Sequence, residues 1–340
     1  MKSNYRYIVK AFMAMAVIAG TTSCDDFLDR EPMSSISPET YYSTAAQLEA
    51  NLNDEYPNVL PSFGQWTYGI FGEDKGTDNQ IEVNANDRYT QDRWKVPHSE
   101  SDNWKFERIY RINFFLSEAL PKFGEDMSGS QNTISGSVAT IKHYIGEMYF
   151  LRAYEYFKKL QLFGDFPIIN QPLADEMEAL REASKRFPRN EVARFIISDL
   201  DKAYAYMSDV DMATTRINKD VAMLVKSRVA LFEATWLQNF KGTAFVPGGE
   251  GWPGASLHNN YQYPSGNIDN EVKYFLEQAV EASKLVADKY KGSLTENTGV
   301  LQQSADDPSN PYFDMFAQED LSDVKEVLLW RQYARGLSTH

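Results

Sequence analysis

The sequence is poor in the side chains that build disulfide frameworks and many catalytic centres. It contains one cysteine, Cys24, in 340 residues, so an internal disulfide is excluded. Its four histidines, His98, His143, His258 and His340, are far apart, and none stands at metal-ligand spacing from another. We therefore predict no metal and no cofactor.

Catalytic sequence motifs are missing as well. The chain has no H-E-x-x-H, no G-x-S-x-G, no Walker loop and no G-x-G-x-x-G. It has 48 Asp and Glu residues, but no spacing singles out a pair for glycoside hydrolysis. The missing motifs lower the expectation of an enzyme and favour a binding protein. They do not exclude catalysis, because catalytic groups can also assemble in space from distant segments.

Positive charge is scarce relative to negative charge. The chain has 34 Lys and Arg residues against 48 Asp and Glu, which gives a net charge of −14. Nucleic acid is a poor partner for such a chain, because its binding depends mostly on neutralised phosphates. An uncharged or cationic ligand fits the charge better. Aromatic residues are abundant at 14%, and the flat faces of Tyr and Trp stack on sugars or bases.

The first 23 residues are typical of a signal peptide. Lys2, Arg6 and Lys10 form a basic segment, and the apolar run at 11–20 is too short to span a bilayer. Cys24 follows directly, where we expect a lipid-modified cysteine; the alternative is an ordinary buried one. Residues 24–38 are expected to form a lipid-anchored tether, and residues 39–340 the folded domain.

A long helix is predicted within residues 134–169 and should be central to the fold. Its apolar residues recur every three or four positions, as one helix face requires: Ile134, Val138, Ile141, Ile145, Met148 and Leu151. Tyr and Phe residues widen that face, which favours a position inside a bundle. Gly164 can adopt the left-handed conformation that ends a helix, and Pro167 forbids continuation.

The rest of the chain has mainly helical patterns. We expect helices at about 38–53, 101–120, 188–207, 217–240 and 270–289, and a short buried strand at 324–332. Pro57 should break the chain after the first of these helices, and Pro121 should end the second. Residues 62–99 lack helical periodicity, and a polar connector leads to Phe187. The absence of strand–helix alternation favours a mainly helical fold.

Several motifs resemble those of one protein family. Arg152, Ala153, Tyr156 and Phe157, with L-F-G-D-F-P at 162–167, closely resemble the R-A-x-x-Y-F and L-F-G-D-x-P motifs of SusD-like (RagB/SusD) outer-membrane lipoproteins. The arrangement of Trp, Tyr, Arg, Ile and Asn within 104–113 is similar to that family too. So is the run C-D-D-F-L-D-R-E-P that begins at Cys24.

The resemblance implies a tetratricopeptide-like helical repeat scaffold with long irregular insertions that form the binding face. It also implies a lipid anchor on Cys24, with fatty acyl chains such as palmitate, and a location at the cell outer membrane facing the exterior. The implied partner is a SusC-like TonB-dependent transporter. Family members normally continue well past His340, so we expect the chain to hold the N-terminal and central part of the fold and to be truncated at its C-terminus.

An irregular segment at 71–94 is predicted to hold a ligand. Asp78, Asn79 and Arg88 supply polar groups for sugar hydroxyls, and Trp94 supplies a flat face for the sugar ring. The alternative is a solvated loop whose tryptophan covers an edge of the core. Calcium is a weaker possibility, because the acidic residues of this segment do not match an EF-hand.

A second ligand segment is predicted in the Gly/Pro-rich loop 247–264, through Trp252 and Tyr261. Large aromatic side chains on such a loop are costly to expose unless another part of the protein or a ligand covers them.

Other conspicuous side chains are expected to be structural. Trp104 and Trp236 lie on helical faces and are predicted to be core residues. Arg152 should pair with an internal carboxylate or with carbonyl groups, and His143 should be packed or half exposed.

The sequence and the resemblance together predict a cell-surface lipoprotein that captures oligosaccharide and delivers it to the transporter without catalysis. Three alternatives stay open: a lipid-anchored glycoside hydrolase that uses the same aromatic loops, a binder of a non-glycan nutrient such as a peptide, and a helical scaffold without a ligand.

Overall fold

The structure is a computed structural model that describes residues 41–61, 80, 103–124, 126–208, 212–301, 303–304 and 306–333. The chain divides into two compact units, residues 1–42 and 43–340, and the account below is of the second. The predicted signal peptide and tether lie outside the described residues, as does the predicted irregular segment 62–99 apart from Gln80.

The predicted central helix is α6 (Val138–Phe163). The Ser137 side chain caps its start by accepting a hydrogen bond from the Thr140 backbone N–H at 3.4 Å. Most of the predicted apolar ladder is buried, but Val138, the first residue of the helix, keeps 39% of its surface exposed. The helix ends at Phe163, and Gly164 caps it with the positive φ predicted for it, 69°, although its ψ of −102° differs from that of a left-handed helical residue.

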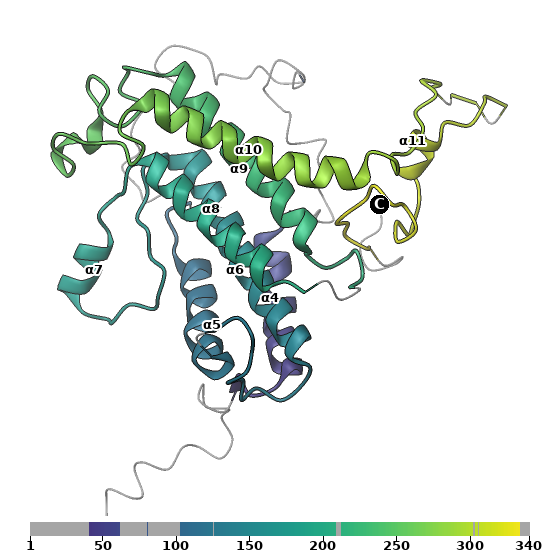
Figure 1. Ribbon diagram of the computed structural model, residues 1–340, viewed down its shortest axis with the longest axis horizontal. Coiled ribbons are helices and arrows are strands. Elements are labelled where there is room, and N and C mark those ends of the chain that lie inside the picture. The colour runs from purple at the N-terminus through teal and green to yellow at the C-terminus, as the bar shows by residue number, and fades with distance from the viewer. Residues whose placement is uncertain are drawn as a thin grey trace, which may run out of the picture. The chain divides into compact units, whose positions relative to one another are not determined.

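The other long helices surround α6 or continue the bundle beside it (Figure 1). α4 (Ala45–Val59), α5 (Glu107–Phe123) and α8 (Arg189–Tyr206) pack against α6. α9 (Lys219–Asn239) packs between α8 and α10 (Ile268–Tyr290), with its more extensive contact to α10. The described ranges contain isolated bridges but no strand. The prediction of a mainly helical fold is confirmed.

Polar pairs show that successive helices run antiparallel. Arg189 at the start of α8 bonds to Glu233 near the end of α9. Lys289 near the end of α10 bonds to Asp220 in the first turn of α9. Repeated antiparallel helix pairs are the arrangement expected of a helical-repeat scaffold.

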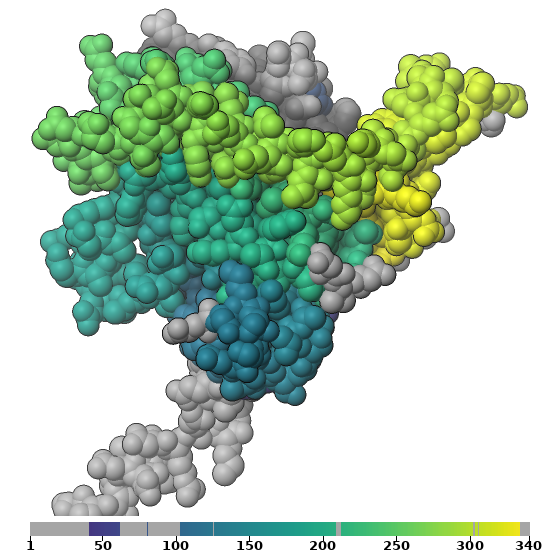
Figure 2. Space-filling view, in the orientation of Figure 1, coloured from purple at the N-terminus to yellow at the C-terminus, as the bar shows by residue number. Residues whose placement is uncertain are grey.

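The outer surface of this bundle is formed in part by α10. Figure 2 shows α10 and the loop before it on the outside of the face in view. Leu276, Val280 and Leu285 on α10 are exposed, whereas Phe275 faces inward and is fully buried. No helix in the described ranges combines the length and the apolar content that crossing a bilayer requires.

The contact between α6 and α8 depends on Gly146. A Cβ atom at this position would lie 2.8 Å from the Met207 backbone nitrogen and 2.9 Å from the Ala203 carbonyl oxygen. Real side chains do not approach backbone atoms so closely, so glycine allows the two helices to meet here.

Arg152 forms the ion pair that was predicted inside the bundle. Its Nε and Nη2 donate to the Asp199 carboxylate at 2.6 and 2.8 Å, and its Nη1 donates to Asn113 Oδ1 at 2.9 Å. The Arg152 side chain is 4% exposed and that of Asp199 is fully buried. The pair joins α6 to α8, and Asn113 adds α5 to the same network.

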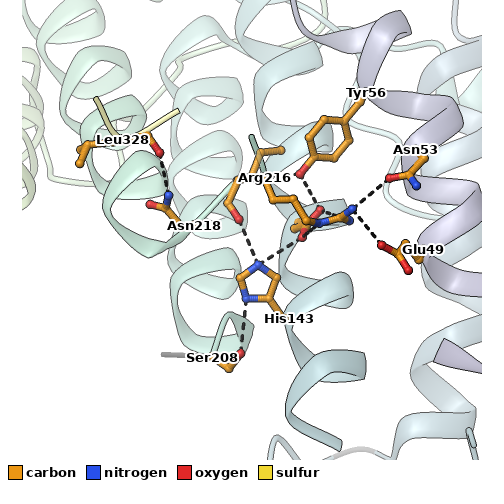
Figure 3. A network of polar contacts seen from close by, with 10 residues as sticks. Glu49, Asn53, Tyr56, His143, Ser208, Arg216, Asn218 and Leu328 are labelled. Carbon is orange, nitrogen blue, oxygen red and sulfur yellow. Dashed lines mark hydrogen bonds and ion pairs between the residues drawn. The ribbon is translucent and has the colours of Figure 1, made fainter. Parts of the chain in front are cut away.

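A second buried polar network joins α4 and α6 to the segment before α9 (Figure 3). Glu147 of α6 accepts hydrogen bonds from the Arg216 guanidinium at 2.9 and 3.0 Å and from the Tyr56 hydroxyl at 2.6 Å. His143, one turn before Glu147 and 1% exposed, donates through Nε2 to the Ile217 carbonyl at 3.0 Å. His143 is therefore packed, as predicted.

Several predicted boundaries are wrong. Pro57 and Pro121 lie inside the last turns of α4 and α5, which continue to Val59 and Phe123. A proline removes its own N–H bond, but Val59 and Phe123 are fully buried and their packing holds the final residues in helical form. The second helix begins at Glu107 rather than near Ser101.

The start predicted for the first helix, at 38, lies outside the described residues. Within them, α4 begins at Ala45 and is capped by Thr44. The Thr44 side chain and Gln47 form a capping box there.

The strand predicted at 324–332 is also wrong. Residues 325–326 form a turn, residues 326–329 lie beside α9, and no part of the stretch pairs with a strand among the described residues. Instead, the Leu328 carbonyl accepts a hydrogen bond from Asn218 at 2.8 Å, and the Trp330 backbone N–H donates to the Thr214 carbonyl at 3.1 Å. The predicted polar connector before Phe187 contains a short helix, α7 (Met177–Ala183), which has no buried residue.

Gly164→Val is expected to destabilise the fold by roughly 1–2 kcal/mol, because a β-branched residue is strained at a φ of 69°. Gly292→Val is the matched control, since a Cβ there meets no other atom within 4 Å. Chemical denaturation of both variants measures the difference. Equal midpoints for Gly164→Val and the wild type would show that the end of α6 tolerates a side chain.

Candidate functional site

A cavity of about 480 Å³ lies where α6 ends, α8 begins and α9 ends. The L-F-G-D turn at 162–165 forms one side, and residues 244–257 of the loop between α9 and α10 form another. Arg186, Arg189 and Trp236 complete the lining. Part of the second predicted ligand segment, 247–264, lines this cavity.

Aromatic side chains supply much of the surface of this cavity. Trp236 is half-buried, and its indole N–H donates to the Phe245 carbonyl at 3.0 Å. The Phe245 ring is 61% exposed and packs edge-on against Phe240. A cavity of this size with aromatic walls is typical of small-molecule and saccharide sites.

Trp252 also lines the cavity but is 5% exposed. Its indole N–H donates to Asp165 Oδ2 at 2.7 Å. Asp165 Oδ1 accepts from the backbone N–H of Arg189 at 2.9 Å, at the start of α8. One carboxylate therefore fixes the turn after α6, the first residue of α8 and the loop that carries Trp252.

Burial raises the pKa of the Asp165 carboxyl group, and the hydrogen bonds from Trp252 and Arg189 act in the opposite direction. Both oxygens of this carboxylate are occupied. Asp165 therefore has a positioning role in the cavity wall.

Each arginine that lines the cavity lies over a tryptophan. The Arg189 guanidinium carbon is 4.0 Å from the centre of the Trp236 ring, and that of Arg186 is 4.6 Å from the centre of the Trp104 ring. Such cation–π contacts hold a guanidinium flat against the ring.

The two arginines differ in their ionic partners. Arg189 Nε and Nη2 donate to the two oxygens of Glu233, at 3.0 and 2.9 Å. Glu233 is fully buried, and this burial raises its pKa although the neighbouring Arg189 opposes the shift. Arg186 is exposed and lies in the segment between α7 and α8.

Tyr261 contacts Trp252 and is not among the residues that line the cavity. The two ring centres are 5.6 Å apart. The Tyr261 hydroxyl donates to Asn190 Oδ1 at 3.0 Å, and Asn190 Nδ2 donates to Glu271 at 3.0 Å. Burial raises the pKa of the Tyr261 phenol. Tyr261 supports the loop and Trp252.

The structure describes two of the predicted site residues, Trp252 and Tyr261. Trp252 and Tyr261 come together at one cavity, where only Trp252 is part of the lining. The remaining predicted residues lie outside the described residues: Cys24, Asp78, Asn79, Arg88 and Trp94. Among the described residues, no cluster of three or more His, Cys, Asp or Glu side chains is arranged to hold a metal ion.

The prediction that Trp104 and Trp236 are core residues is wrong in part. Both are half-buried, and Trp104 precedes α5 instead of lying on a helical face. A guanidinium lies over one face of each ring. The sequence reasoning also missed Arg186 and Phe245. Their chemistry gave no signal, because an exposed arginine or a loop phenylalanine becomes part of a site only through its tertiary neighbours.

Comparison with known proteins gives the following matches. Residues 26–231, more than half of the chain, match the family model of SusD-like proteins described as "Starch-binding associating with outer membrane". SusD-like protein P2 of Formosa agariphila is 25% identical over 253 residues, which are 71% of this chain and 46% of that protein. SusD-like protein P25 of the same organism is 25% identical over 233 residues, 63% of this chain and 41% of that protein.

The chain thus spans about half the length of the curated relatives it matches. Among solved structures, a SusD-like protein from Bacteroides fragilis aligns with a TM-score of 0.43 and 21% identity. That alignment covers 62% of this chain and 39% of the other.

Asp165→Asn is expected to loosen the loop that carries Trp252. The carboxylate accepts two N–H donors, and an amide in the same place offers one oxygen and one NH₂ group, so one donor faces another. The loss should be roughly 1–3 kcal/mol, with faster amide exchange in residues 249–258. Asp269→Asn, at an exposed ion pair with Lys241, is the control and should change little. Unaltered melting and exchange in Asp165→Asn would contradict the positioning role.

Proposed function

Since the chain belongs to the SusD-like family, we propose that it is a cell-surface lipoprotein that captures oligosaccharide and passes it to a SusC-like TonB-dependent transporter. The match of residues 26–231 to the family model carries this proposal. The family description, which names starch binding and association with the outer membrane, supports both the ligand class and the location. We place the protein at the outer membrane, held by a lipid on Cys24 and facing the exterior.

The cavity at the end of α6 supports saccharide capture. A sugar ring needs a flat apolar surface for its C–H face, and the 61% exposed Phe245 offers one in a cavity of about 480 Å³ whose wall also includes the half-buried Trp236 and the buried Trp252. Hydroxyl groups need fixed planar donors, and the stacked guanidinium groups of Arg186 and Arg189 provide them. We propose that this cavity is one part of the saccharide site and that the predicted segment 71–94 is another.

The carboxylates at the cavity favour binding without hydrolysis. A glycosidase uses two carboxyl groups, one of which gives a proton to the leaving oxygen. Asp165 is the acid that lines the cavity within the described residues, and N–H donors occupy both of its oxygens. Glu233, the buried partner of Arg189, does not line the cavity, and both of its oxygens are occupied as well. Incubation with a panel of polysaccharides tests this reading, because release of reducing ends would identify a hydrolase instead.

Cys24→Ala is expected to release the protein from membranes or to leave the signal peptide uncleaved. The thiol is the acceptor for the lipid in this proposal, and alanine has no sulfur to acylate. Membrane fractionation and the mass of the mature chain measure the effect. A variant that matures normally and stays with the membrane fraction would rule out the anchor on Cys24.

Phe245→Ala is expected to lower saccharide affinity several-fold without lowering thermal stability. The ring is 61% exposed, so its removal costs little burial, whereas a lost stacking contact is worth about 0.5–1.5 kcal/mol. Titration calorimetry and melting of the same variant separate the two effects. Trp94→Ala tests the segment 71–94 in the same way, with lost affinity and unchanged melting expected.

Phe316→Ala, whose ring is 71% exposed and which is not among the residues lining the cavity, is the matched control. Equal affinity in Phe245→Ala and Phe316→Ala would remove the cavity from the saccharide site.

A further inference from the structure

Arg186 is held in a fixed position at the edge of the cavity. Its carbonyl oxygen accepts a hydrogen bond from His258 Nε2 at 2.8 Å, so its backbone is tied to the loop between α9 and α10. The next residue, Phe187, exchanges two backbone hydrogen bonds with Phe166, at 3.0 and 3.2 Å. Trp104 lies under the guanidinium at 4.6 Å. The group is therefore preorganised, unlike a freely moving surface arginine.

The guanidinium donors of Arg186 are not used within the described part of the chain. No hydrogen bond or ion pair joins them to another described side chain, although Arg186 lines the cavity. Arg189 also lines the cavity, and only its Nε and Nη2 are engaged by Glu233. Its Nη1 is 3.4 Å from the position of a Cβ built on Gly164 in the cavity wall.

The Asp165 carboxylate in the cavity wall and the Glu233 carboxylate that pairs with Arg189 are already occupied. Trp252 and the Arg189 backbone N–H use the two oxygens of Asp165, and Arg189 uses both oxygens of Glu233. The charges of Arg189 and Glu233 cancel as a close pair. Among the charged residues in the described lining, Arg186 is therefore the one that remains open toward a ligand.

The net charge of the chain, −14, does not decide which charge the cavity prefers in a ligand. Charges separated by more than about 8 Å are largely screened at physiological ionic strength. A guanidinium stacked on an aromatic ring within the cavity therefore acts on a bound group more strongly than distant surface acids do.

We propose that Arg186 selects saccharides that carry an oxyanion, a carboxylate or a sulfate, over neutral saccharides of the same backbone. The planar fork of a guanidinium matches two oxygens of either group. The aromatic walls would hold the sugar ring while Arg186 binds its charged substituent. This inference rests on the proposed saccharide capture and names the class of saccharide that the same cavity takes.

Titration calorimetry on the full chain tests the proposal with matched pairs of ligands. The carboxylate arm uses oligogalacturonate and oligoalginate, each against its methyl ester, which keeps the backbone and removes the charge. The sulfate arm uses a sulfated galactan oligosaccharide against its desulfated form. In at least one pair the charged member should bind about tenfold more tightly, because a charge-assisted hydrogen bond contributes roughly that factor. The arm with the larger preference identifies the oxyanion.

Arg186→Gln should abolish this preference, because glutamine keeps N–H donors for hydroxyl groups but loses the positive charge, so the affinity for the charged ligand should fall about tenfold relative to that for the neutral ligand. Arg186→Lys, which retains the charge without the planar fork, should fall between the two. Arg181→Gln is the matched control, since Arg181 is an exposed arginine of α7 paired with Glu178 at 3.5 Å, and it should leave the preference intact. Melting curves verify that each variant is folded.

The outcomes separate this inference from the proposed function. Equal affinity for charged and neutral members, with Phe245→Ala weakening both, would leave saccharide capture in place and overturn the role of Arg186. A preference for the charged member that survives in Arg186→Gln would overturn that role as well. Binding of no saccharide, charged or neutral, would overturn both.

Discussion

The bundle depends on charged side chains that are buried on its central helix. α6 places Glu147 and Arg152 in the interior, where both residues are almost completely shielded from solvent. An unpaired charge in such a place costs several kcal/mol, so each needs a particular partner. Arg152 takes Asp199 from α8, and Glu147 takes Arg216 from the segment before α9. These pairs fix which helices lie against α6 and at which height, a constraint that apolar contacts alone do not impose.

The same principle operates at the end of α6, where the cavity lies. Gly164 ends the helix, and Asp165 immediately after it accepts N–H donors from the start of α8 and from Trp252. Arg189, the first residue of α8, then pairs with Glu233 of α9. The cavity wall is thus built by polar pairs that continue outward from the central helix. This construction explains why the L-F-G-D turn is positioned accurately enough to be one side of a site.

The helices and the loop between α9 and α10 have different roles. The helices provide a rigid scaffold, and the irregular loop between α9 and α10 carries the aromatic groups that can meet a ligand. Two hydrogen bonds fix that loop: Tyr261 of the loop donates to Asn190 of α8, and Trp252 of the loop donates to Asp165. In the proposed function, a change of a loop residue such as Phe245 would alter the ligand while the helix pairs stay the same.

The sequence by itself determined the helical class, the position and the C-terminal end of α6, the family, and the internal pairing of Arg152; the helix starts at Val138, after the predicted ladder residue Ile134. These features are encoded locally: apolar periodicity specifies a buried helix, Gly164 specifies its end, and a charge on a buried face requires a partner. It also indicated the loop that carries Trp252, since exposed aromatics on a Gly/Pro-rich segment need a cover. Only the tertiary structure decided that Pro57 and Pro121 remain helical, that 324–332 finds no strand partner, and that Trp236 and Arg186 face a cavity. The reason is physical: these outcomes depend on contacts between residues distant in the chain, and such contacts can outweigh or redirect a local preference of about 1–3 kcal/mol.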